Sequence, residues 1–158
     1  MKDKVLRDHL VKLLKGGQAF VTFDNAIKNV KPELRNKRPS KEIHSVWENL
    51  EHMRIAQEDI LKYSIDPKWE SPDWPEGYWP QNSGSIDDNA WNESVASFIR
   101  DREEVIKLAM NEKIDLTSII PHTEEHTYLR EILLVADHNA YHLGQVVIVR
   151  KLLNDWPV

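Results

Sequence analysis

The nine residues DHNAYHLGQ, at positions 137–145, lie in the most strongly patterned part of the sequence. His138 and His142 are four residues apart, and on an α-helix this spacing places both imidazoles on one face, about one turn apart. Two ring nitrogens placed in this way can bind one metal ion at roughly 2.0–2.2 Å. The same spacing fits two core histidines that hydrogen-bond to polar neighbours, so these residues alone leave both interpretations open.

A seven-residue repeat through this segment predicts which side of the helix faces the protein core. Several positions of the repeat are polar, and a buried polar group costs about 1–3 kcal/mol if it is unpaired, so we expect a compensating partner. The segment is not the zinc-protease motif H-E-x-x-H, because Asn139 stands where that motif has its catalytic glutamate. The predicted inward seam consists of Leu134, His138, Tyr141, Gln145, Ile148 and Leu152, with His142 beside it.

Helical spacing extends through most of the chain, and β-strand patterns are hard to find. An apolar stripe over residues 5–14 is interrupted by Gly16 and Gly17 and resumes over 19–30, which predicts a broken first helix. Three later stripes each follow a residue that can cap a helix N-terminus, and the second resembles a capping box. The predicted spans are Ser40 to about Tyr63, Ser85 to Ala109 and Thr123 to Leu153.

Residues 64–86 differ in composition, since they contain four prolines and four tryptophan or tyrosine residues. A connection this long is unusual in a compact domain, and its aromatic content argues against disorder. It is long enough to run the length of a helical bundle, and it either walls a pocket or packs across a bundle end or a dimer contact. The sequence therefore predicts an all-α fold, a four-helix bundle with a long aromatic loop between its second and third helices, as a single domain over residues 1–158.

The composition of the 158 residues excludes several classes of function. Lys and Arg total 21 and Asp and Glu total 26, and the resulting charge of −5 argues against electrostatic binding of nucleic acid or of an anionic membrane. There is no cysteine, which excludes disulfides, thiolate metal sites and a cysteine nucleophile. No run of about 20 apolar residues or signal-like N-terminus is evident, so we expect a cytoplasmic protein.

The remaining histidines give a weaker signal than the pair at 138 and 142. His44, Glu48 and His52 are spaced four residues apart along the predicted second helix. At 100° per residue, His52 lies about 160° around the helix from the apolar stripe, so periodicity alone predicts that it faces solvent. The other three histidines, two of them next to the predicted start of the last helix, are assigned no metal: His9, His122 and His126.

Three segments together resemble the DinB-like family, the DinB/YfiT group of metalloenzymes: HSVWENLEH at 44–52, PEGYWP at 75–80, and LRE at 129–131 with the motif at 137–145. The pattern Y-H-x-G-Q, with a histidine four residues before its own, is the most specific of these. The resemblance implies a four-helix bundle in which three histidines hold a divalent metal, one from the second helix and two from the fourth. These correspond to His52, His138 and His142, which places His52 in the site despite its position on the helix.

Three neutral imidazole ligands leave coordination positions open, which is typical of a catalytic site, and such a site suits Zn, Ni, Fe or Cu. The resemblance implies either a transferase that uses a low-molecular-weight thiol or a metal-dependent hydrolase, acting on a small molecule. Any thiol must come from the substrate, because the chain has no cysteine.

Two alternatives to an enzyme remain: a stress-response bundle with a structural metal, and a metal-free interaction module. We also expect a homodimer. By spacing, Glu48, Tyr141 and Gln145 are candidates to contact the ligands or to close the pocket.

Overall fold

The computed structural model describes residues 3–81 and 84–157, and within these ranges the chain forms five α-helices and two short 3₁₀-helices, with no β-strand. This confirms the predicted all-α fold. The resumed stripe over 19–30 is helical only at its centre. The elements are α1 (Lys4–Lys15), α2 (Phe23–Ile27), η1 (Pro32–Leu34), α3 (Val46–Ile65), η2 (Glu76–Tyr78), α4 (Asp88–Met110) and α5 (Tyr128–Leu152).

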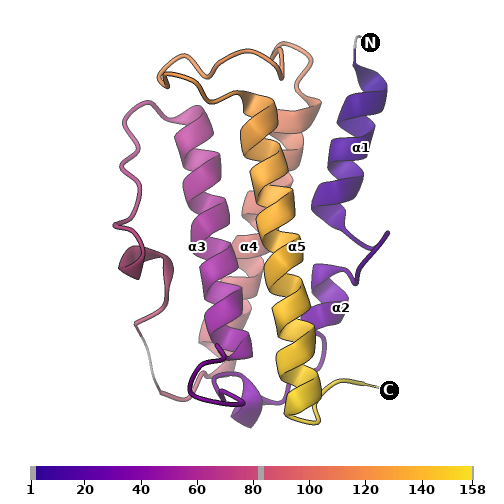
Figure 1. The fold of residues 1–158 in the computed structure, drawn as a ribbon, viewed down its shortest axis with the longest axis vertical. Helices are drawn as coiled ribbons and strands as arrows, with labels where there is room; N and C mark the ends of the chain where they lie inside the picture. Colours follow the sequence, from indigo (N-terminus) through magenta and orange to yellow (C-terminus); the bar gives the residue numbers. More distant parts are fainter. Residues whose placement is uncertain (1–2, 82–83, 158) are drawn as a thin grey trace.

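Helices α3, α4 and α5 run side by side, and α1 packs against α4 and α5 (Figure 1). Helices α3 and α4 are parallel, because the connection between them returns along the length of α3 (Figure 1). Helix α5 is antiparallel to both. This arrangement brings the N-terminal half of α3 beside the middle of α5, which is where the histidines of the two helices lie.

The helix starts differ from the predicted ones. The N-cap of α3 is Ser45 rather than Ser40, and it forms a capping box in which Glu48 bonds back to the Ser45 backbone N–H. The N-cap of α4 is Asp87 rather than Ser85.

The N-cap of α5 is Thr127 rather than Thr123. The Thr123 hydroxyl instead bonds the carbonyls of Ile120 and His126, which closes a turn before the helix. His122 and His126 therefore precede α5, whereas the sequence placed them at its start.

Two apolar clusters form the core. One lies between α2 and the ends of α3, α4 and α5 nearest to it, and the other lies between α1 and the opposite ends of these helices. Between them, Gln57 of α3 donates to the carbonyl of Phe98 on α4 at 2.8 Å and accepts from Asn139 of α5 at 2.9 Å. These bonds connect the three long helices at mid-height.

The inward seam predicted for α5 was wrong. Tyr141 and Ile148 are 68% and 56% exposed, and Leu152 is also exposed. The helix is rotated by about one residue step, and its buried side chains include Val135, Asn139, His142, Val146 and Val149. Because α5 carries apolar residues on nearly every side, its own pattern did not single out one face, and packing against α3 and α4 selects it.

Helix α5 is also, within the described residues, the one helix long and apolar enough to span a membrane by length and composition. In its most apolar window, 39% of the residues are buried inside the protein. Core helices pass the same test, so this property is weak evidence for a membrane span.

Candidate metal centre

Three imidazoles meet between α3 and α5. His52 comes from α3, and His138 and His142 come from successive turns of α5. The Nε2 atoms of His52 and His138 are 3.0 Å apart, and one potential ligand atom from each of the three residues lies within 4.8 Å of the others. Among the described residues, this is the one group of three or more His or acidic side chains with such spacing.

The protonation of His52 is set by the loop that follows α3. Its Nδ1 lies 2.9 Å from the backbone carbonyl of Tyr78. A carbonyl oxygen only accepts hydrogen bonds, so this nitrogen carries the proton, and the Nε2 atom of the neutral ring keeps its lone pair for a metal ion. The Tyr78 carbonyl thus fixes the orientation of the His52 ring.

The side chain of Asn49 sets the protonation of His142. The side-chain amide nitrogen of Asn49 donates to the carbonyl of Ser45 at 2.9 Å, which leaves its Oδ1 directed at His142 Nδ1, 3.0 Å away. Nδ1 of His142 must therefore carry the proton, and its Nε2 is free to bind. No role was predicted for Asn49 or Tyr78, although both lie in segments that carry the family resemblance, because helical spacing does not reveal which groups bond to a ring after folding.

Trp79 covers the site from the loop side. Its ring stacks on His52, with centroids 4.0 Å apart and planes 1° from parallel, and it also stacks on His44 at 3.9 Å. His52 is consequently only 4% exposed, although it points away from the apolar stripe of α3. The periodicity-based expectation that His52 faces solvent was wrong, because the aromatic loop buries that side of the helix.

The site keeps its imidazoles neutral. Burial lowers the pKa of His138 to about 4 and that of His142 to about 3, and the neighbouring imidazoles lower both further. Burial also lowers the pKa of His52, although its bond to the Tyr78 carbonyl acts in the opposite direction. At neutral pH all three rings are therefore in the form that binds a metal ion.

The three residues expected near the ligands have different surroundings. The Glu48 carboxylate pairs with Arg38 and caps α3; burial alone would raise its pKa, but these hydrogen bonds outweigh burial and lower the pKa to about 2. The exposed Tyr141 ring lies 5.0 Å from that of His142, and Gln145 is half-buried one turn further on. A role for Tyr141 or Gln145 at the site stays a prediction.

The fold and these three side chains define a helical protein with a candidate three-histidine metal centre. The sequence matches the family model of the DinB superfamily over residues 18–146, which is well over half of the chain and includes all three histidines. The chain therefore belongs to the DinB superfamily. No curated protein and no solved structure matches it.

Proposed function

We propose that this protein binds one divalent metal ion, Zn, Ni or Fe, through the Nε2 atoms of His52, His138 and His142. The observation that carries the proposal is the hydrogen bonding of two rings: the Nδ1 atoms of His52 and His142 are both committed to protein acceptors, so each ring is unprotonated at Nε2 when it is neutral. We also interpret the packing of α1, α3, α4 and α5 as the four-helix bundle that the family resemblance implies.

We further propose that the site is catalytic. A bound divalent metal would act there as a Lewis acid toward an oxygen or sulfur atom of a small molecule. The chain itself holds the imidazoles neutral, fixes two of them by hydrogen bonds, and excludes water on one side with Trp79, while the partly exposed His138 leaves an approach. These features suit a metal-dependent hydrolase, or a transferase whose thiol arrives with the substrate.

The alternative is a structural metal that joins α3 to α5. Its ligands do come from both helices, but the bonds of Gln57 and the two apolar clusters hold α3 and α5 together independently of the histidines. We therefore expect removal of the metal to leave the fold nearly intact. Unfolding of the chain by a chelator, measured by circular dichroism, would favour the structural role.

Metal analysis tests the binding proposal directly. Protein purified without an affinity tag or chelator should contain close to one divalent ion per chain, and the His138→Ala, His142→Ala double variant should contain almost none. The matched control is His122→Ala, His126→Ala, which removes two histidines at the same spacing from outside the site and should keep the metal. Equal metal content in the two double variants would refute the site.

A further inference from the structure

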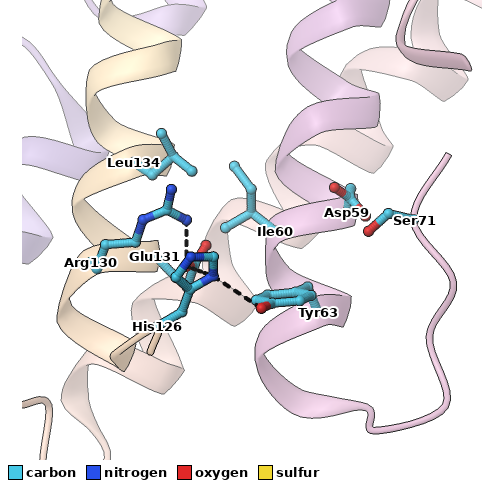
Figure 2. A pocket seen from close by; sticks show the side chains of 8 residues that line it. All are labelled: Asp59, Ile60, Tyr63, Ser71, His126, Arg130, Glu131 and Leu134. Atoms are coloured by element: carbon cyan, nitrogen blue, oxygen red, sulfur yellow. Dashed lines mark hydrogen bonds and ion pairs between the residues drawn. The ribbon is translucent and has the colours of Figure 1, made fainter. Parts of the chain in front are cut away.

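A cavity lies between α3 and α5, about two helical turns from the three histidines. It encloses about 200 Å³ and is lined from α3 by Asp59 and Tyr63 and from the α5 side by His126, Arg130 and Glu131. Figure 2 shows these side chains, with Ser71 of the aromatic loop on the α3 side. Whole-ligand pockets usually measure about 300–1,000 Å³, so this volume suits one end of a molecule.

The cavity and the histidines lie along the same faces of α3 and α5. Asp59 follows His52 by seven residues on α3, and Glu131 precedes His138 by seven residues on α5, which at 1.5 Å per residue is about 10 Å along each helix. Because the two helices are antiparallel, both offsets run in the same direction. Tyr78 contacts both the histidines and the cavity, since its carbonyl accepts from His52 and its hydroxyl donates to Asp59 at 2.6 Å.

The charged groups of the cavity differ in what they offer a ligand. Both Asp59 carboxylate oxygens already accept hydrogen bonds, from Trp69 and Tyr78. Glu131 is 2% exposed and accepts from one nitrogen of Arg130 at 2.6 Å. The Arg130 side chain is 50% exposed, so the buried carboxylate holds one nitrogen of the guanidinium while the remaining donors are accessible to a ligand. Arginine in this setting binds carboxylates with two parallel hydrogen bonds.

We propose that this cavity binds a carboxylate group of the substrate, about 10 Å from the group that reacts at the metal centre, with Arg130 as its main contact. The Tyr63 hydroxyl also lines the cavity and bonds to Nδ1 of His126 at 3.0 Å, and Ser71 lines the cavity from the α3 side (Figure 2). The inference rests on the proposed function, because the distance is measured from the three histidines. It assigns the substrate class as an elongated carboxylic acid.

The test uses ligands with a metal-binding hydroxamate at one end and a carboxylate at the other. An extended chain advances roughly 1.25 Å per methylene, so about eight methylenes span the roughly 10 Å between the histidines and the cavity. Calorimetric titration of the Zn²⁺-loaded protein should show the carboxylate binding about tenfold more tightly than its methyl ester and than the matching terminal amine, because a charged hydrogen bond is worth at least one factor of ten. Chains of two or three methylenes should show no such preference.

Variants assign the preference to Arg130. Arg130→Gln should remove the tenfold difference without changing Zn²⁺ affinity. The double variant Arg130→Gln, Glu131→Gln should do the same without leaving a buried carboxylate unpaired. Arg100→Gln, on the exposed side of α4, is the matched control and should keep the preference.

Equal affinity for acid and ester, or tighter binding of the amine, would overturn the carboxylate site while the metal site stands. A preference that survives both Arg130 variants would overturn it as well. Failure of the wild-type protein to bind Zn²⁺, Ni²⁺ or Fe²⁺ in separate titrations would instead refute the proposed function and this inference with it.

Discussion

Replacing Asn49 with alanine removes the acceptor that holds His142 in its metal-binding tautomer. Asn49 is fully buried, and its side-chain oxygen is the acceptor that faces Nδ1 of His142. In the variant, Nδ1 of His142 loses its 3.0 Å partner, and the ring is free to move its proton to Nε2, the atom that we propose binds the metal. Asn49→Asp keeps an acceptor at this position.

The expected loss of metal affinity is 10- to 100-fold for Asn49→Ala, the range found when a hydrogen-bond partner of a ligand is removed. This corresponds to about 1.4–2.7 kcal/mol. The free energy of unfolding of the metal-free protein should also fall by about 1–3 kcal/mol, because the variant leaves a buried donor on His142 without its partner and removes the side-chain hydrogen bond to the Ser45 carbonyl. Asn49→Asp should bind the metal within a few-fold of the wild type.

Competition with a chromophoric chelator measures the metal affinity, and urea denaturation measures stability. Gln57→Ala is the matched control, since Gln57 is also a buried amide on α3 but bonds to Phe98 and Asn139 rather than to a ligand ring. It should lower stability by a similar amount and leave metal affinity unchanged. If Asn49→Ala loses stability but binds metal as tightly as the wild type, the reasoning about the His142 tautomer is wrong.

Three further perturbations have defined outcomes. The pKa of Glu48 is lowered to about 2, so the contribution of its carboxylate to stability is complete above pH 4.5 and is lost as the pH falls toward 2. Wild type should be more stable than Glu48→Gln by about 1 kcal/mol after solvent screening. Urea titrations should show this difference shrinking between pH 4.5 and pH 2. Trp79→Ala should weaken metal binding several-fold in the chelator assay, because His52 loses its stacked ring. Arg150→Leu should cost about 3–5 kcal/mol in urea denaturation, because it leaves Asp155 buried and unpaired.

The tryptophan and arginine variants each have a control. Trp74→Ala alters a 75% exposed tryptophan of the same loop and should not affect metal binding; an equal loss in both tryptophan variants would argue against stacking as the cause. Adding Asp155→Asn to Arg150→Leu should restore part of the stability. No recovery would mean that the unpaired carboxylate is not what destabilises the single variant.

Local patterns predicted the helices better than their ends. Apolar spacing located all three long helices, but Ser40 and Thr123 are as suitable for capping as Ser45 and Thr127. Bonds between residues further apart decide which of these candidates caps the helix. The backbone N–H of Trp47 donates to the carbonyl of Arg35, and the backbone N–H of Ile120 donates to the carbonyl of His126. These two bonds position the chain at the start of α3 and just before α5. Periodicity within one segment contains no information about such bonds.

The candidate site was also predicted only in part from the sequence. The spacing of His138 and His142 was visible from the sequence, because helix geometry alone places residues four apart on one face. The inclusion of His52 came from the family resemblance and not from periodicity, which placed it in solvent. Only the packed loop resolves that conflict, since Trp79 buries a face of α3 that the helix by itself leaves open.

What the sequence by itself determined is therefore the local part: an all-helical chain, its long aromatic connection, and two histidines one turn apart. The tertiary structure decided which side of the largely apolar α5 is buried, which nitrogen of His52 and of His142 is protonated, and that a cavity lined by Arg130 lies between α3 and α5. The physical reason is that helical spacing depends on near neighbours. Burial and tautomers depend on groups, such as Asn49 and the Tyr78 carbonyl, that reach the histidines only through folding.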